Sequence, residues 1–176
     1  MVPQTSSGVW LAVAVKIRAF EDADWPAVYA IIQEVIEGGE TYAYDPQWSE
    51  DECREVWAGP AHTITVVAVD DDGTILGTAH SGPNRPGRGS HVSTASFMVS
   101  GQARGKGVGR ALGEYVLAWA RSAGYHSMQF NAVVESNTVA VKLWHSLGFE
   151  TIGIVPEAFD SRAHGLVGLH VMYQKF

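Results

Sequence analysis

The segment VSGQARGKGVGRAL, residues 99–112, decides how the rest of the chain is interpreted. It holds three glycines within residues 105–109, and a helical pattern follows them. Glycine loses more backbone entropy on folding than any other residue, so such a cluster needs a reason. A helix N-terminus offers unpaired N–H groups and a partial positive charge to anions, and Arg104 and Lys106 add cationic charge in the same turn. The segment therefore predicts a diphosphate cradle, with a tight strand-to-helix turn that binds nothing as the alternative.

Two common nucleotide-binding motifs do not fit this segment. A P-loop requires Ser or Thr after its Gly-Lys pair, but Gly107 follows Lys106. A Rossmann turn requires a third glycine where Arg110 stands, and it follows the first strand of its unit rather than a series of strands and helices. Both motifs are therefore disfavoured.

Strand and helix patterns alternate along the chain on both sides of the segment. Asp22 or Asp24 is expected to cap the first helix and Ser49 the second, and Asp72-Gly73 is a strong hairpin signal. Strands are expected at 10–19, in two runs that flank that hairpin, and at 91–99, 126–134, 149–155 and 166–173. Helices are expected at 24–38, at 49–57, from the glycine cluster to 123, and at 137–147.

Composition limits the class of protein. The 176 residues suit a single domain, 1–176, with residues 1–14 as a lead-in to the first strand. A net charge of −7 argues against nucleic-acid binding, because phosphate contacts need a cationic surface. No apolar run approaches the roughly 18 residues of a membrane span, and the seven histidines lack the spacing of a metal site. Cys53 is the one cysteine, which suits a reducing cytoplasm, and its acidic neighbours favour a partly buried helical residue over a nucleophile.

Segment 99–112 resembles motif A of the GNAT superfamily of acyl-CoA-dependent N-acyltransferases, whose signature is matched by Arg104, Gly107 and Gly109. Further on, ESNTVAVKLWHSLGF, residues 135–149, resembles the second half of that fold, where an Asn opens a helix that ends in Gly-Phe. The resemblance covers the chain from about residue 15 to the end. It implies an α/β fold with a mixed central sheet of about seven strands flanked by about four helices.

The resemblance also implies where acetyl-CoA binds as co-substrate, without a metal. The pantetheine arm would lie along the strand that ends near Val99, and the diphosphate on the glycine turn. The amine would attack the thioester directly in a ternary complex, and the N–H of Met98, Val99 or Ser100 would stabilise the oxyanion. The implied cofactor-binding residues are Met98, Val99, Arg104, Gly105, Lys106, Gly107, Val108, Gly109, Arg110 and Asn137.

The acid and the base of many relatives have no counterpart here. Strand 91–99 contains no Glu, and Trp144 stands seven residues after Asn137, where many relatives have Tyr. An indole N–H donates hydrogen bonds but is not a useful acid. The proton of the amine must therefore pass to another group or to water. The candidates are Glu135, His91, His145, and a water chain ordered by Ser93, Thr94 or Asn131.

Two further segments, PNRPGRGSHVSTASFMV (residues 83–99) and VPEAFDSRAHGLVGLHVMY (residues 155–173), resemble a small-molecule branch of this superfamily. That branch includes acetyltransferases of proline-like amino acids and their toxic analogues. In that branch, polar groups on the fourth and fifth strands handle the substrate, which points to Thr94 and Asn131; with Glu135 these are the candidate catalytic residues. Tyr42 and Tyr44 would line the acceptor pocket, with loop aromatics that pack on the core as the alternative. Arg85 would hold a substrate carboxylate through its two-pronged guanidinium. The alternative arginines for that carboxylate are Arg88 and Arg162.

We therefore expect an N-acetyltransferase that moves an acetyl group from acetyl-CoA to the amine of an amino acid, an imino acid or an analogue. Two alternatives remain open at this point, because a fold does not specify its acceptor. One is acetylation of a protein or peptide, and the other is a CoA-binding module without transfer activity. The resemblance also suggests a homodimer that pairs through exposed strand edges.

Overall fold

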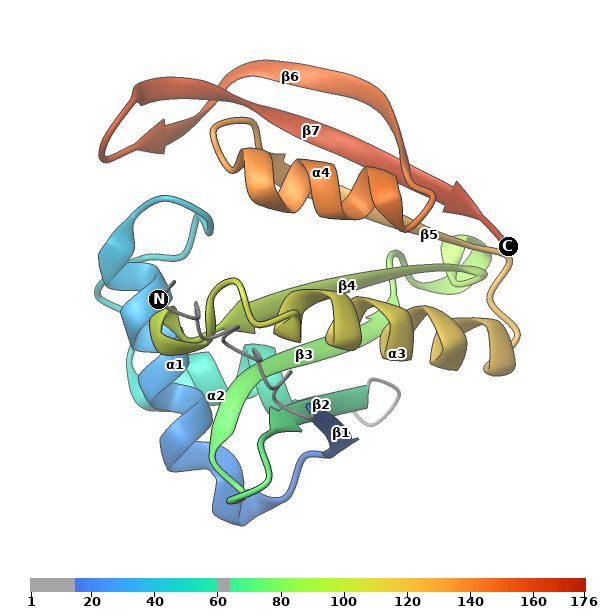
Figure 1. The fold of residues 1–176 in the computed structure, drawn as a ribbon. Helices are drawn as coiled ribbons and strands as arrows, with labels where there is room; N and C mark the ends of the chain where they lie inside the picture. Colours follow the sequence, from blue (N-terminus) through green and yellow to red (C-terminus); the bar gives the residue numbers. More distant parts are fainter. Residues whose placement is uncertain (1–14, 60–63) are drawn as a thin grey trace, which may run out of the picture.

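The computed structural model describes residues 15–59 and 64–176, so the expected lead-in of residues 1–14 lies outside the described residues. Within these ranges, seven strands form one mixed sheet in the order β1-β2-β3-β4-β5-β7-β6, and four α-helices accompany it (Figure 1). This confirms the expected α/β class. The first half comprises β1 (Lys16–Ala19), α1 (Trp25–Gly38), α2 (Glu50–Ala58), β2 (Ile64–Val69) and β3 (Ile75–Pro83). The second half comprises β4 (Val92–Val99), α3 (Val108–Ser122), β5 (Ser127–Val134), α4 (Thr138–Ser146), β6 (Glu150–Ser161) and β7 (Gly165–Lys175).

Local sequence signals set the starts of α1 and α2. Ser49 caps α2 as expected: its hydroxyl accepts the Glu52 N–H (3.3 Å), and the Glu52 carboxylate accepts the Ser49 N–H (2.7 Å). Asp24 precedes α1, but its carboxylate does not cap the helix, because it accepts two hydrogen bonds from the Arg18 guanidinium (2.6 and 2.7 Å). This pairing lowers the pKa of Asp24 and ties β1 to the start of α1.

The C-terminal hairpin is longer than the sequence predicts. β6 has 12 residues and β7 has 11, whereas strands were expected only at 149–155 and 166–173. The pairing register shifts between Val155 and Phe159, and Glu157 in this bulge has a φ of 52°. A bulge breaks the two-residue alternation from which strands are predicted, so the outer part of β6 gave no strand signal.

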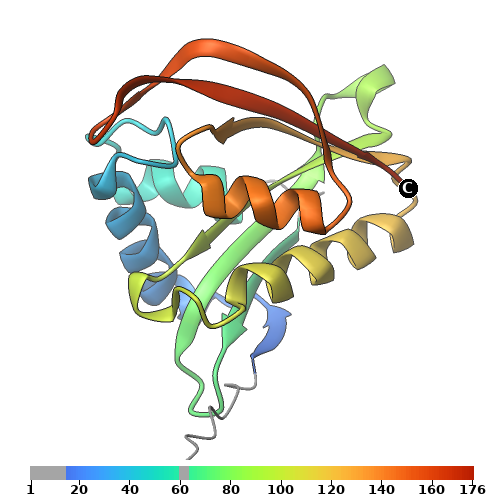
Figure 2. The same ribbon diagram turned by 45° about the horizontal axis from the view of Figure 1, so that its top comes forward.

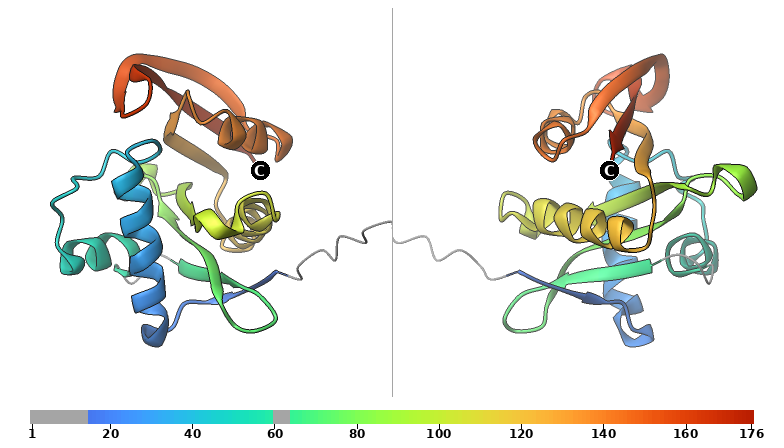
Figure 3. Two further views of the ribbon diagram at one scale, coloured as in Figure 1. Left: turned by 60° about the vertical axis from the view of Figure 1, so that its left-hand side comes forward. Right: turned by 90° about the vertical axis from the view of Figure 1, so that its right-hand side faces the viewer.

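The helices cover the two faces of the sheet in pairs. α1 and α2 lie on one face, and α3 and α4 lie on the other (Figure 3). Met98 of β4 is buried in the core with α1 and α2, whereas Phe130 of β5 is buried in the core with α3 and α4. Successive residues of a strand point to opposite faces. Thr94 therefore lies on the α1–α2 side with Met98, as does Gln129, which precedes Phe130. Asn131 lies in the bulge after Phe130, and its side chain bonds to that of Gln129 on the same side.

The tip of the β6–β7 hairpin reaches back to the end of α1 (Figures 1 and 2). There the Glu40 carboxylate accepts hydrogen bonds from the Ser161 hydroxyl (2.7 Å) and the Ala163 N–H (2.8 Å). Arg162 donates its main-chain N–H to the Gly39 carbonyl (3.2 Å). The hydrogen bond from Ser161 lowers the pKa of Glu40. These contacts join the first and last parts of the chain on the α1–α2 side of the sheet.

Candidate functional site

β4 and β5 are parallel neighbours that separate soon after they begin to pair. Within the described strands, the register joins only the first two residues of each, although β4 runs on to Val99 and β5 to Val134. At the fork, the Ser93 hydroxyl donates to the Ser127 carbonyl (3.0 Å). Main-chain N–H and C=O groups away from water need partners. Beyond Ser93, β5 therefore leaves the edge of β4 open, so its main-chain groups can pair with a side chain or with a ligand.

Only alternate residues of β4 turn their main-chain groups toward this open edge. Ser100 donates its N–H to the Leu76 carbonyl (3.0 Å), so its N–H points toward β3. In an antiparallel pair such bonding recurs at every second residue, which gives Met98 the same orientation. Phe97 and Val99 therefore face the gap. The expectation that the Ser100 or Met98 N–H stabilises an oxyanion is wrong, because the Ser100 N–H is bonded to Leu76 and the Met98 N–H also points toward β3.

The glycine segment forms the turn between β4 and α3. Gly105 and Gly107 have φ values of 75° and 80°, in the left-handed region that glycine adopts at low cost. The space that a Cβ would fill is open at both positions. The Ala111 N–H donates to the Gly107 carbonyl (3.0 Å) in the first turn of α3. Val108 and Gly109 precede Ala111 in the chain, so their N–H groups belong to the first turn, where a helix has no internal partner for them. They lie at the positive end of the helix dipole, and such a position suits a diphosphate.

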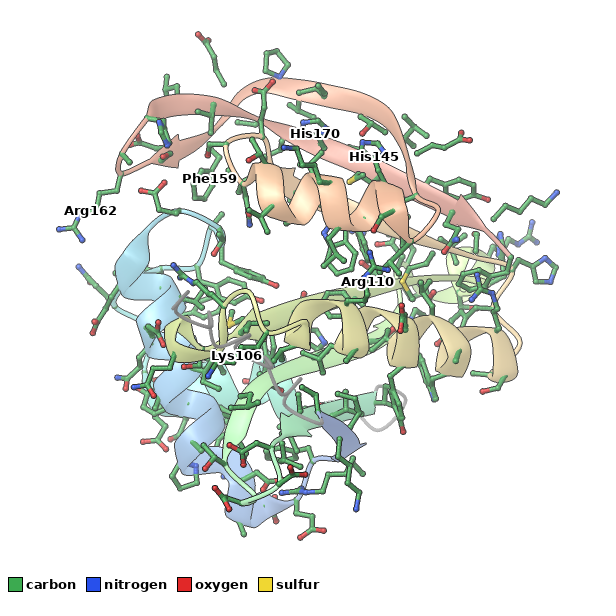
Figure 4. The ribbon with its side chains drawn as sticks, in the orientation of Figure 1. Lys106, Arg110, His145, Phe159, Arg162 and His170 are labelled. Carbon is green, nitrogen blue, oxygen red and sulfur yellow. The ribbon has the colours of Figure 1, made fainter. Side chains whose placement is uncertain are left out.

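Two cationic side chains of this turn remain available to an anion. Arg104 and Lys106 are exposed, and neither forms an ion pair within the described part of the chain. Lys106 comes from the turn and Arg110 from the first turn of α3 (Figure 4). The Arg110 guanidinium donates to the Ser146 hydroxyl of α4 (2.6 Å), so it links the two helices.

α4 begins at Asn137 and packs closely against α3. The Asn137 side-chain oxygen accepts the Ala140 N–H (3.2 Å), which caps the helix. Gly109 in α3 faces Leu143 in α4, and a Cβ at this glycine would lie 3.4 Å from the Leu143 side chain. That distance is an ordinary contact, whereas a Cβ at Gly113 would lie 2.8 Å from the Leu147 side chain, so Gly113 is the glycine that allows the close approach of the two helices.

Trp144 of α4 fills the space between the diverging strands on the α3–α4 side. Its ring centroid lies 4.7 Å from that of Phe97 on β4 and 4.8 Å from that of Phe130 on β5. The residue is 7% exposed. The indole therefore packs in an aromatic cluster. It stands at the position where many relatives have the Tyr that acts as an acid.

Tyr42, from the segment between α1 and α2, reaches the open edge of β4. Its hydroxyl accepts the Phe97 N–H (2.8 Å) and donates to the Phe97 carbonyl (2.9 Å). Its ring lies 5.2 Å from that of Tyr44 and packs edge-on against Trp57 at 6.4 Å. Burial raises the pKa of Tyr42, so the phenol stays protonated at neutral pH.

Thr94 and Asn131 share the α1–α2 side of the sheet with a small polar network. Asn131 lies in a bulge of β5; its amide nitrogen donates to the Asn84 side-chain oxygen (2.7 Å), and its amide oxygen accepts from Gln129 (2.8 Å). The exposed Arg85 donates to the Asn84 carbonyl (2.9 Å). The structure therefore brings Asn131 and the Arg85 loop together, as a substrate site would require.

Glu135 and Arg162 make contacts outside that network. The Glu135 carboxylate accepts the Gly168 N–H of β7 (3.0 Å), so it fixes the end of β5 to β7. The Arg162 guanidinium donates to the Glu37 carbonyl (3.1 Å) at the hairpin tip and points away from the sheet (Figure 4). Arg88 is exposed in the turn before β4.

Three of the histidines that the structure describes lie in different environments. His145 donates its Nδ1–H to the Phe149 carbonyl (2.9 Å), since a carbonyl can only accept. His91 is exposed beside a hollow of about 500 Å³ at the other end of β4 from the glycine turn. His80 of β3 carried no sequence signal; it packs edge-on against Trp57 (4.7 Å), and burial lowers its pKa to about 4.

Three polar residues of the site were not found from the sequence. Asn84 and Gln129 hold the Asn131 amide, and Glu34 accepts the Gly101 N–H (2.9 Å) at the start of the glycine turn. Gln129 carries a usable signal, because residues two apart in a strand share a face. Glu34 carries none, since it lies 67 residues from Gly101.

Cys53 lies in α2, as expected, but it is fully rather than partly buried. Burial, followed by the charges of Glu52 and Glu50, raises the pKa of its thiol, which disfavours a nucleophilic role. Within residues 15–59 and 64–176, no group of three His, Cys, Asp or Glu side chains is placed to hold a metal. No helix in the same ranges is long and apolar enough to cross a membrane.

Comparison with known proteins gives consistent matches. The model of the acetyltransferase (GNAT) family matches residues 24–149. A solved GCN5-related N-acetyltransferase from Kribbella flavida is 55% identical, with 93% of this chain and 98% of that chain covered and a TM-score of 0.91. An L-methionine sulfoximine/L-methionine sulfone acetyltransferase from Pseudomonas paraeruginosa is 32% identical over 82% of this chain and 86% of that protein. A phosphinothricin acetyltransferase from Sinorhizobium meliloti, solved with acetyl-CoA, has the same fold (TM-score 0.82, 23% identity, 92% and 88% covered).

Proposed function

The chain belongs to the acetyltransferase (GNAT) family, and on this premise we propose that it transfers the acetyl group of acetyl-CoA to the amine of a small molecule. The acceptor in this proposal is an amino acid, an imino acid or an analogue of one. The observation that carries the proposal is the fork between β4 and β5, because the open edge of β4 leads directly into the glycine turn before α3. An extended arm that pairs with this edge delivers its diphosphate to the N-terminus of α3.

The proposed cofactor site extends from the open edge to the start of α4. Met98 and Val99 lie beside the pantetheine arm, and the exposed Arg104 and Lys106 balance the charge of the phosphates. Asn137, at the start of α4, lies on the other side of the arm. The Sinorhizobium meliloti relative supports acetyl-CoA as the ligand, since it shares the fold and holds that molecule.

In the proposed reaction, the amine attacks the thioester directly within a ternary complex. The Val99 N–H points into the gap and is placed to donate to the pantetheine arm beside the reacting thioester. The proton of the amine passes to water ordered by Thr94 and Asn131, or to the Glu135 carboxylate. The bond from the Gly168 N–H already occupies one oxygen of Glu135, which favours the water route.

The proposed acceptor site lies on the α1–α2 side of the sheet. Tyr42, Thr94 and Asn131 line it, and Arg85 binds the carboxylate of an amino-acid acceptor through a two-pronged contact. The relative from Pseudomonas paraeruginosa supports this class of acceptor, because its named substrates are amino-acid derivatives.

Replacing Asn131 by Ala is expected to raise the KM for the acceptor roughly 5–10-fold, in line with the loss of about one hydrogen bond. The KM for acetyl-CoA should stay unchanged, since Asn131 lies on the opposite side of the sheet from α3 and α4. Steady-state kinetics with each substrate varied in turn would measure both constants. A rise in the KM for acetyl-CoA alone, with an unchanged KM for the acceptor, would contradict the proposed position of the acceptor.

Trp144→Tyr is expected to keep kcat within about tenfold of the wild type, because Trp144 supplies packing rather than a proton. The new hydroxyl must find a partner in an aromatic cluster, so a modest loss of stability is expected. A collapse of turnover with unchanged acetyl-CoA affinity would show that the indole takes part in the chemistry.

A thiol-release assay with acetyl-CoA tests the proposed function. The acceptor panel should contain L-methionine sulfone, L-methionine sulfoximine, phosphinothricin, L-proline, a proline-like imino acid and peptides with free N-termini. Turnover with at least one of the small amines is the expected result. Turnover with the peptides alone would instead identify a peptide acetyltransferase. Binding of acetyl-CoA by calorimetry without any turnover would identify a binding module.

We further propose that the protein is a single catalytic domain that acts in the cytoplasm and pairs through β6. β6 is an edge strand of the sheet, and the hairpin exposes several large apolar side chains, which a second copy can cover. Sedimentation velocity should show a dimer, and Ile152→Asp should convert it to a monomer. These apolar residues are Ile152, Ile154, Val155 and Leu166.

A further inference from the structure

The hydroxyl of Tyr42 occupies the open edge of β4 at Phe97. It accepts the Phe97 N–H at 2.8 Å and donates to the Phe97 carbonyl at 2.9 Å. β5 does not pair with this part of β4, because the two strands have already separated. A single side-chain hydroxyl therefore supplies both hydrogen bonds that a neighbouring strand would otherwise supply.

The ring of Tyr42 is held in place by the core beneath α1 and α2. It packs against Tyr44 at 5.2 Å and edge-on against Trp57 at 6.4 Å. Trp57 is 1% exposed, and its indole donates to the Thr78 hydroxyl (3.0 Å), so this support is rigid. The phenol thus stands between the α1–α2 side of the sheet, where the acceptor is proposed to bind, and the gap proposed for the acyl arm.

Acetyl transfer creates a negative charge on the carbonyl oxygen of the acetyl group. Fixed N–H and O–H donors aimed at that oxygen stabilise the transition state more than the ground state. The Phe97 N–H points into the gap, and the Tyr42 O–H lies beside it. Burial raises the pKa of Tyr42, so the phenol keeps its proton and acts as a donor rather than a base.

We propose that Tyr42 is a catalytic residue of the acetyl transfer, forming an oxyanion hole together with the main-chain N–H of Phe97. The Tyr42 ring stays in place: its O–H turns from the Phe97 carbonyl to the acetyl oxygen, which shares the Phe97 N–H with the phenol oxygen. This inference rests on the proposed function, because it takes the acetyl group to lie on this edge of β4.

The step balances without any further reactant. The amine nitrogen forms a bond to the carbonyl carbon, and the π electrons of the C=O bond move to the oxygen, which accepts from Phe97 and Tyr42. When that electron pair returns, the C–S bond breaks and the thiolate leaves. The proton lost by the nitrogen passes through water to the sulfur, and Tyr42 retains its own proton throughout.

The test is Tyr42→Phe, assayed with acetyl-CoA in two reactions: transfer to L-methionine sulfone, and hydrolysis by water alone. Both reactions pass through the same oxyanion, so kcat should fall on the order of 100-fold in each. The KM and the calorimetric Kd for acetyl-CoA should change less than about threefold, because the interaction forms in the transition state.

Tyr44→Phe is the matched control, since it removes a second partly buried tyrosine hydroxyl from the same segment. Burial raises the pKa of Tyr44 to about 12, and its ring stacks on Trp48 at 4.8 Å, whereas its hydroxyl does not bond to the main chain of Phe97. This variant should keep kcat within about threefold of the wild type. Equal losses in both variants would overturn the proposal, as would a Tyr42→Phe variant that lost only acetyl-CoA affinity or nothing.

If Tyr42→Phe does not fold, 3-fluorotyrosine at position 42 replaces it in the test. The fluorinated ring keeps its shape while its O–H becomes a stronger donor, so kcat should rise; an unchanged or lower kcat overturns the proposal. A wild-type protein that binds acetyl-CoA but releases no CoA in either reaction would overturn the proposed function itself and this inference with it.

Discussion

Replacing Gly107 by Val is expected to weaken the binding of acetyl-CoA on the order of 100-fold, or about 2.7 kcal/mol. Gly107 has a φ of 80° directly before α3, a conformation that a β-branched residue does not adopt without strain. The new side chain would also extend into the open space beside the N–H groups that begin the helix. Both effects disturb the proposed diphosphate cradle, and calorimetry with acetyl-CoA would measure the loss.

Gly73→Val is the matched control for this prediction. Gly73 also has a φ of 80°, and open space surrounds the position of its missing Cβ, but it lies in the β2–β3 hairpin. Both variants should lose a similar amount of stability, about 1–2 kcal/mol, because the backbone strain is the same. Only Gly107→Val should lose acetyl-CoA affinity. Equal affinity in two folded variants would show that the diphosphate binds elsewhere.

The features that the sequence predicted well are set by residues close together in the chain. The Ser49 cap of α2, the hairpin at Gly73 and the turn at Gly107 each depend on a few consecutive residues whose backbone preferences agree. The order of strands and helices follows from such local signals, and the family resemblance then supplied the sheet. Local agreement of this kind is why the fold could be predicted before any contact was known.

The features that the sequence did not reveal are contacts between distant segments. Tyr42 meets Phe97 across 55 residues, and Glu34 meets Gly101 across 67. No spacing rule connects such pairs. The separation of β4 from β5 also cannot be predicted from the sequence, because each strand alone has an ordinary alternating pattern. The orientation of the Ser100 N–H depends on the register of β4 against β3, which sequence alone did not fix.

Trp57→Ala is expected to lower the free energy of unfolding by about 3–5 kcal/mol, the range for large aromatic residues removed from a core. Trp57 is 1% exposed in the core beneath α1 and α2. Its indole donates to the Thr78 hydroxyl (3.0 Å), which in turn donates to the Val66 carbonyl (2.9 Å). Removal of the indole leaves a cavity and withdraws one hydrogen bond from a buried hydroxyl.

Thermal unfolding would measure this loss as a fall in Tm of roughly 6–20 °C for a chain of this length. Trp48→Ala is the control, because Trp48 is only partly buried and stacks on Tyr44 at the surface of the same segment (4.8 Å). Trp48→Ala should lower the free energy of unfolding by less than about half as much as Trp57→Ala does. An equal fall in the two variants would mean that Trp57 does not anchor this core. The ring of Tyr42 would then lack the rigid support on which its proposed position at Phe97 depends.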